Sequence, residues 1–191
     1  MGYRRRIIEN ISDALCEKNG QRKEHTRRVG ELSASIGRAM GLDLEREEDL
    51  RSLGYVHDIG NIAIAPEVLA KKGPLSDEEW AIVRQHPETG YRILGAINEL
   101  AHLSKVVLSH HERWDGSGYP RGLREREIPL EARILAVADA YDSMTTDLPY
   151  HEALSEQEAR EIIRACAGTH FDPDVVDAFL TGKSGVAKEA R

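Results

Sequence analysis

Apolar residues recur every three to four positions along most of the chain, and this spacing predicts amphipathic helices. The strict alternation of apolar and polar residues that marks a half-buried strand does not occur. The pattern therefore predicts an all-α fold. The segments with helical periodicity lie within residues 7–15, 25–41, 50–60, 76–87, 100–111, 129–141, 155–168 and 172–179.

Local signals predict where several of these helices begin or end. Ser76 and Ser155 are each followed three residues later by a glutamate, and this capping box predicts a helix start. Asp172 with Pro173 predicts another start, because aspartate caps a helix and proline suits its first turn. We expect the helix that begins after Ser76 to be broken at Pro87.

The chain has 191 residues, 40% of them hydrophobic, which suits one domain with one core. No linker or repeat divides it, so we expect a single domain at residues 21–181. Residues 1–20 are interpreted as a connecting helix and residues 182–191 as a flexible polar tail. The apolar stripe within residues 7–15 could form a homodimer or pack on the core. The glycine-rich sequence at 115–120 predicts an ordered loop.

Charge and cysteine content exclude several classes of protein. Acidic residues outnumber basic ones by 33 to 26, and the net charge of −7 argues against binding of duplex nucleic acid. A single nucleotide could still bind in a locally positive pocket, to which metal ions could supply the charge. Cys16 and Cys166 indicate neither a disulfide framework nor a thiolate zinc site. Because the sequence has no apolar run of membrane-spanning length and no signal sequence, we expect no membrane segment and a cytoplasmic location.

Histidine and aspartate residues stand out at the ends of the predicted helices. His57 and Asp58 follow one apolar stripe, and His110 and His111 end another. A carboxylate is rarely buried without a partner, and a divalent ion bound jointly with imidazole would provide one. Simpler interpretations exist, because a single core histidine is normally just hydrogen-bonded and adjacent histidines could both lie at the surface.

Asp139 is a lone acid in an apolar helical stretch, and it could pair with either a metal or Arg133. Taken together, five histidines and two aspartates exceed the four ligands of one zinc ion. They would better suit two octahedral ions such as iron or manganese. The candidate ligands are His25, His57, Asp58, His86, His110, His111 and Asp139.

With these motifs, the sequence resembles the HD-GYP family, a subgroup of the HD metal-dependent phosphohydrolases. The resemblance covers roughly residues 20–180, and the long motif at 110–120 is its most specific part. The matching motifs are H-D-I-G at 57–60, L-S-D-E-E-W at 75–80, H-P-E-T-G at 86–90, H-H-E-R-W-D-G-S-G-Y-P at 110–120, R-I-L-A-V-A-D at 133–139 and F-D-P at 171–173.

The resemblance implies a single helical HD-domain bundle with a metal centre in its core. It also implies hydrolysis of cyclic di-GMP to linear pGpG, or onward to GMP, by a hydroxide that bridges two ions. Asp58 would bridge the ions, and Asp58 and His57 would be the catalytic residues. One ion would be held by His25, His57, Asp58 and Asp139, and the other by His86, His110, His111 and Asp58.

The implied substrate contacts lie around the glycine-rich loop, which we expect to form the rim of the pocket. The same loop could contact a signalling-protein partner. The residues assigned to substrate binding are Asn61, Arg113, Gly118, Tyr119, Pro120 and Arg121.

Four positions depart from the family pattern. Gln21 stands where trinuclear members have a glutamate ligand, so we expect two ions, with iron favoured and manganese as the alternative. Asn61, Leu148 and His151 replace a lysine, an arginine and a lysine of the usual substrate site. Each lost charge-assisted contact costs about 1.5–3 kcal/mol of binding. Three functions therefore stay open: hydrolysis of cyclic di-GMP, hydrolysis of another cyclic dinucleotide such as cyclic GMP-AMP, and a catalytically weak sensor or interaction module.

Overall fold

A computed structural model of the chain describes residues 6–8, 10, 11, 13, 22–71, 73–147 and 152–182. Within these residues the fold is helical, and strand-like pairing is limited to one isolated bridge between Ala167 and Phe171. This confirms the all-α prediction. The helices are α2 (Arg22–Ala39), α3 (Leu44–Val56), α4 (Pro66–Leu69), α5 (Asp77–Val83), α6 (His86–Gly95), α7 (Ser104–Ser109), α8 (Leu130–Thr145), α9 (Glu156–Ala165) and α10 (Pro173–Thr181), with 3₁₀ turns η1 (Ile59–Ala63), η2 (Ala101–Leu103) and η3 (Glu125–Glu127).

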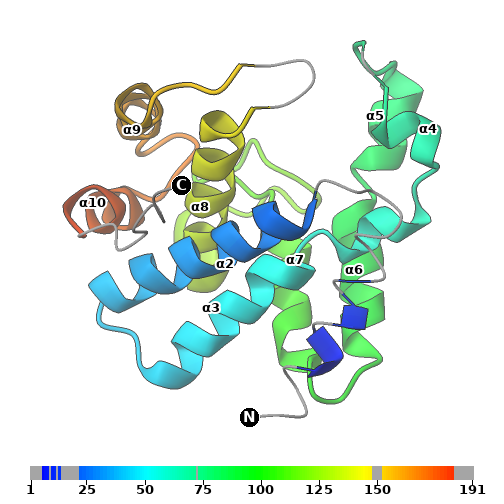
Figure 1. Cartoon of the computed structure of the whole chain (residues 1–191), viewed down its shortest axis with the longest axis horizontal. Helices are drawn as coiled ribbons and strands as arrows, with labels where there is room; N and C mark the ends of the chain where they lie inside the picture. Colours follow the sequence, from blue (N-terminus) through cyan, green and yellow to red (C-terminus); the bar gives the residue numbers. More distant parts are fainter. Residues whose placement is uncertain are drawn as a thin grey trace, which may run out of the picture.

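Helices α2, α3 and α8 form the centre of the bundle, and α6 packs against η1 and α7 beside them (Figure 1). Their apolar faces meet in one core, where Val29, Leu53 and Leu135 are fully buried. Helices α9 and α10 lie at one side of this bundle, and α4 and α5 project at the other (Figure 1). Neither α4 nor α5 has a buried residue, so these two helices form an exposed arm, here called the α4–α5 arm.

Two close approaches bring the segment around His57 and Asp58 against its neighbours. A Cβ at Gly54 would lie 2.2 Å from the Cα of Gly30, so α2 and α3 can come this close only without side chains at these positions. A Cβ at Gly60 would lie 1.9 Å from the carbonyl oxygen of His86. Glycine at both points lets three histidine-bearing segments meet.

The predicted helix starts are confirmed. The Ser76 and Ser155 side chains each accept from the backbone of the glutamate three residues on, and Asp172 accepts from Asp174 N at 2.8 Å. The prediction at Pro87 was wrong, because this proline does not interrupt a helix but lies in the first turn of α6. A proline has no N–H, so it can mark the start of a helix as well as the end of one.

The α3 helix ends at Val56, four residues earlier than the periodicity predicts, and the chain continues as the 3₁₀ turn η1. At the N-terminal end, Ile8 is buried in the core, and Ile7 and Ile11 pack against it. The described part of this stripe therefore supports packing on the core rather than a dimer contact. Ala14, Leu15 and the tail from residue 183 lie outside the described residues.

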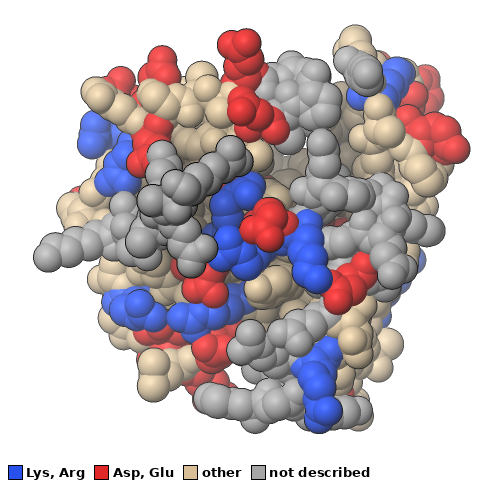
Figure 2. Space-filling model, viewed as in Figure 1, with Lys and Arg blue, Asp and Glu red and all other residues tan. Residues whose placement is uncertain are grey.

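No helix in the described part of the chain combines the length and hydropathy needed to cross a membrane. On the face of the molecule in Figure 2, acidic and basic side chains of the described residues are interspersed. The described residues of this face therefore do not form the broad positive surface that a nucleic-acid duplex requires.

Candidate metal centre

The structure brings all seven predicted ligands together at the centre of the bundle. They arrive from five separate segments, mostly at helix ends, where the side chains can turn inward. Their ligand atoms form two groups, within each of which all atoms lie within 4.8 Å of one another. The first group is His25 from α2, His57 at the end of α3 and Asp139 from α8, and the second is Asp58 before η1, His86 from α6 and His110 and His111 after α7.

In the first group, the Asp139 carboxylate faces two imidazoles. Its Oδ1 lies 3.4 Å from His25 Nε2 and 4.0 Å from His57 Nε2. Burial is the main effect on Asp139 and raises the pKa of its carboxyl above the ordinary value. Asp139 therefore faces two imidazoles, and the alternative pairing with Arg133 was wrong, since Arg133 pairs with Asp172.

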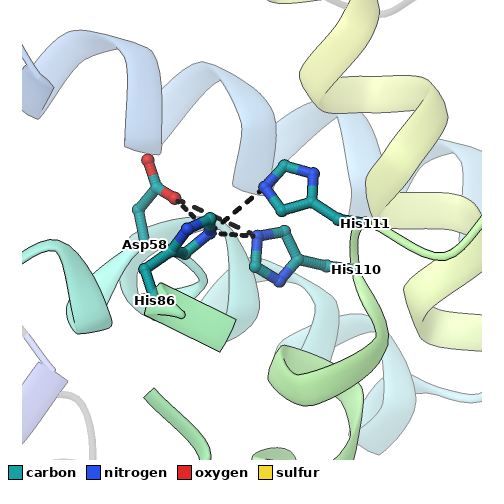
Figure 3. Close-up of side chains that lie close together, drawn as sticks. All are labelled: Asp58, His86, His110 and His111. Atoms are coloured by element: carbon teal, nitrogen blue, oxygen red, sulfur yellow. Dashed lines mark hydrogen bonds and ion pairs between the residues drawn. The ribbon is translucent and has the colours of Figure 1, made fainter. Parts of the chain in front are cut away.

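In the second group, three imidazoles and a carboxylate converge on one point (Figure 3). His86 Nε2 lies 3.2 Å from His110 Nε2 and 3.1 Å from His111 Nε2, and Asp58 Oδ1 lies 3.4 Å from His86 Nε2. His86 and His110 are buried, and His111 is partly covered by Tyr119. The interpretation of His110 and His111 as two surface residues was therefore wrong.

Asp58 joins the two groups. Its Oδ2 lies 3.9 Å from His57 Nε2, while its Oδ1 lies 3.4 Å from His86 Nε2 and 4.0 Å from His110 Nε2. One carboxylate oxygen thus faces each group. This is the placement that a carboxylate shared by two cations would need.

Backbone contacts set the tautomer of three of the histidines. The Nδ1 of His57, His86 and His110 each lies within 2.6–2.9 Å of the carbonyl oxygen three residues earlier. A carbonyl can only accept, so each Nδ1 carries the hydrogen and donates it. Each Nε2 is then left with a lone pair that points into the centre.

Facing lone pairs require a cation between them. The Nε2 atoms of His86 and His110 are both acceptors at 3.2 Å, where they repel each other. A proton does not resolve this at neutral pH, because burial lowers the pKa of His110 well below its ordinary value and that of His111 to about 3. Nitrogens bound about 2.1 Å from a metal at right angles lie about 3.0 Å apart, close to the separation seen here. The donor set and spacing therefore fit a divalent ion.

Two residues that the sequence analysis missed support His25. Asp142 Oδ2 accepts from His25 Nδ1 at 2.7 Å, and Arg28 donates to both Asp142, at 3.0 Å, and Thr146, at 2.9 Å. Burial opposes charge on this pair, yet the hydrogen bond to Asp142 keeps the pKa of His25 raised and bonds from His25 and Arg28 keep that of Asp142 lowered. The spacing in the sequence could have revealed both residues. Arg28 follows His25 by three residues and Asp142 follows Asp139 by three, which places each on the same helix face as the candidate ligand.

The glycine-rich loop lies against the centre, as expected for a rim. The Tyr119 ring stacks on His111, with centroids 4.9 Å apart. A Cβ at Gly118 would lie 2.6 Å from the carbonyl oxygen of His111, so the loop can lie flat here only with glycine. Pro120 is half-buried. The buried carboxylate of Glu112, which the sequence analysis missed, fixes the segment just after the loop by accepting from Arg121 N at 2.7 Å and Leu123 N at 3.1 Å.

The other residues predicted to contact substrate differ in burial and in their surroundings. Asn61 is buried in η1, three residues after Asp58. Arg113 influences Asp115 and His170 electrostatically, and Arg121 is exposed. Gln21, Leu148 and His151 lie outside the described residues, so the expectations based on them stay predictions.

Comparison with known proteins identifies the family of the chain. A family model described as "HD domain" matches residues 9–175. A cyclic di-GMP phosphodiesterase of Thermotoga maritima is 44% identical over 91% of this chain and 48% of its own length, and a 3′3′-cGAMP-specific phosphodiesterase 2 of Vibrio cholerae is 32% identical over 91% and 34%. A solved structure of a cyclic GMP-AMP specific phosphodiesterase from V. cholerae superposes with a TM-score of 0.68 at 20% identity, over 91% of this chain and 47% of that one. The chain thus spans about half the length of the first relative and about a third of the second.

Proposed function

Because this chain belongs to the HD-GYP group of the HD domain family, we propose that it is a metal-dependent phosphodiesterase that hydrolyses cyclic di-GMP to linear pGpG, or onward to GMP. The observation that carries this proposal is Asp58, which turns one carboxylate oxygen toward each of two histidine groups. A relative that is 44% identical over 176 aligned residues is named for the same activity.

The proposed cofactors are two divalent ions, iron or alternatively manganese. When bound, such ions supply Lewis-acid chemistry, since they polarise phosphoryl oxygens and make water more acidic. Neutral imidazole and carboxylate oxygen suit either metal. We assign His25, His57, Asp58 and Asp139 to one ion and His86, His110, His111 and Asp58 to the other.

The chain itself would bind and orient the substrate phosphate. Tyr119 lies over His111, and burial raises the pKa of its hydroxyl to about 12, so the hydroxyl stays protonated at neutral pH. It can therefore donate a hydrogen bond to a phosphate oxygen at the rim. Asn61, on the turn that follows Asp58, offers an amide N–H but no charge.

Two alternatives remain worth testing. Cyclic GMP-AMP is supported by the V. cholerae relatives named for that substrate and by the neutral Asn61. The second alternative is a catalytically weak interaction module that binds a signalling protein at the glycine-rich loop. Such a module would not need the lysine and arginine side chains that Asn61, Leu148 and His151 replace. The homodimer, the cytoplasmic location and the borders at residues 20 and 182 also stay predictions.

Product chromatography tests the proposed function directly. The protein, loaded anaerobically with Fe(II) or Mn(II), is incubated with cyclic di-GMP and, separately, with cyclic GMP-AMP. Asp58→Ala is the blank, and Asp49→Ala is the matched control, because Asp49 pairs with the exposed His102 outside the centre. A linear product in wild type and Asp49→Ala but not in the blank supports the proposal, and the faster substrate identifies its class. Absence of product from protein that holds two metals would favour the interaction module.

A further inference from the structure

A row of side chains leads from the metal centre to the α4–α5 arm. His111 stacks against Tyr119, and the guanidinium carbon of Arg84 lies 5.5 Å from the centroid of the Tyr119 ring. The same carbon lies 5.8 Å from the centroid of the Trp80 ring. Arg84 caps the end of α5, two residues before His86. Its charge is therefore held between two aromatic rings beside the rim of the centre.

The charge of Arg84 has no acidic partner among the described residues. Two cations of the adjoining segments do have acidic partners: Lys71, just after α4, pairs with Glu79 at 2.5 Å, and Arg92 of α6 lies 3.8 Å from Glu88. The contacts of the Arg84 guanidinium described above are with the Trp80 and Tyr119 rings. An aromatic ring does not satisfy the N–H groups at the edge of a guanidinium. That edge remains available to an anion.

A cyclic dinucleotide offers a second anionic group that a cation beside the centre could bind. Such a molecule carries two phosphodiester groups on opposite sides of its ring, and only one of them can react at the metal centre. The second phosphate then lies outside the reach of the ions. Position 61, three residues after Asp58, is a neutral asparagine. Arg84 lies one tyrosine ring away from the ligand His111, on the side toward solvent.

We propose that Arg84 binds the second, non-reacting phosphate of the cyclic dinucleotide and so determines the preference for cyclic dinucleotides over simple phosphodiesters. This inference rests on the proposed function. Tyr119 and Trp80 orient the guanidinium, and its N–H edge contacts the phosphate in the bidentate manner usual for arginine. The interaction helps bind the substrate but takes no part in bond cleavage.

The test compares Arg84→Gln and Arg84→Lys with wild type on two substrates. Cyclic di-GMP has two phosphates, whereas bis(p-nitrophenyl) phosphate has only the reacting one. For Arg84→Gln we expect the KM for cyclic di-GMP to rise about tenfold or more, with a much smaller change in kcat. Arg84→Lys should recover part of the loss, since it restores charge but not bidentate geometry. The small ester should be much less affected by either change.

Controls separate this role from a structural one. Arg92→Gln removes another arginine, exposed on α6 and facing Glu88, and should leave both KM values near wild type. Equal loss of activity on both substrates, or a reduced metal content in Arg84→Gln, would show that Arg84 only supports Tyr119 and would overturn the inference. An unchanged KM for cyclic di-GMP would also overturn it while leaving the proposed function intact. If metal-loaded wild type neither binds nor hydrolyses a cyclic dinucleotide, the proposed function fails and the inference fails with it.

Discussion

The metal centre and the ion pair of Arg133 with Asp172 are both built from polar side chains that are buried or partly buried, but they differ in how those side chains are satisfied. Asp172 accepts from the Arg133 guanidinium and from Asp174 N, and Arg133 also donates to the carbonyl oxygen of Ile128 at 2.9 Å. Donors meet acceptors throughout this pair. In the metal centre, by contrast, acceptor nitrogens face one another at about 3 Å.

This difference separates a structural cluster from a binding site. Burying a polar group costs free energy unless a partner satisfies it, so a cluster that is complete within the chain needs no ligand. The imidazole lone pairs around Asp58 face other acceptors, so a cation is the partner that satisfies them. Both regions are rich in charged or titratable residues, so composition does not distinguish them, whereas the direction of each hydrogen bond does.

The largest expected effect comes from Asp58→Ala. Loss of the carboxylate shared by the two groups should abolish turnover and reduce metal affinity by more than the roughly 10–100-fold that removal of a supporting residue costs. Elemental analysis after gel filtration and the chromatographic assay measure both. Retention of two ions per chain by Asp58→Ala would contradict the bridging role.

Removing Arg133 should lower the stability of the fold but not its metal content, in contrast to the loss of metal expected for Asp58→Ala. Arg133→Met leaves the buried Asp172 carboxylate without its cation, so we expect a loss of about 3–5 kcal/mol in the free energy of unfolding. Urea denaturation measures this change. Asp172→Asn added to Arg133→Met should recover part of the stability, because asparagine still caps α10. Metal content of the folded protein should not change, and a loss of metal here would mean that the two regions are coupled.

Acid should destabilise the metal-free centre. His111 has a folded pKa of about 3 and an unfolded value near 6.5, so the unfolded chain alone binds its proton between these pH values. The contribution of His111 to the free energy of unfolding is therefore complete above pH 6.5. It falls as the pH drops toward 3, by about 1.4 kcal/mol per pH unit for each such group. His110 shifts in the same direction, and His25 shifts in the opposite one.

Urea denaturation of the chelated protein at a series of pH values from 7.5 to 4.5 tests this expectation. The matched sample is His111→Gln, which removes the histidine with the lowered pKa and should flatten the dependence. A stability that is constant over this range in wild type would mean that the imidazoles are not buried as neutral groups.

The smallest effect expected in this comparison is that of Asp142→Asn. Asp142 orients His25 through Nδ1, and loss of its charge should lower the affinity for the ion in that group by about 10–100-fold. Competition with a chelator measures the affinity, and Asp174→Asn at the exposed start of α10 is the control. Equal affinity in wild type and Asp142→Asn would show that Arg28 and Asp142 only tie α2 to α8.

Local signals in the sequence predicted much of the fold. The capping boxes at Ser76 and Ser155 and the cap at Asp172 were placed correctly, because capping depends on residues three positions apart. Pro87 was misinterpreted because the same residue suits the first turn of a helix and disrupts its interior. The choice between the two depended on how α6 packs against η1 and α7, which lie outside the window of any local pattern.

The sequence by itself determined which seven side chains could hold metal, because imidazole and carboxylate within or at the ends of apolar helices have few other satisfactory partners. It also determined the helical class, through a periodicity that each segment carries independently. Only the tertiary structure decided that Arg133 pairs with Asp172, that Asp142 supports His25, and that Arg84 lies against Tyr119. Each of these contacts joins residues at least 35 positions apart in the chain, and such contacts depend on how whole helices pack together.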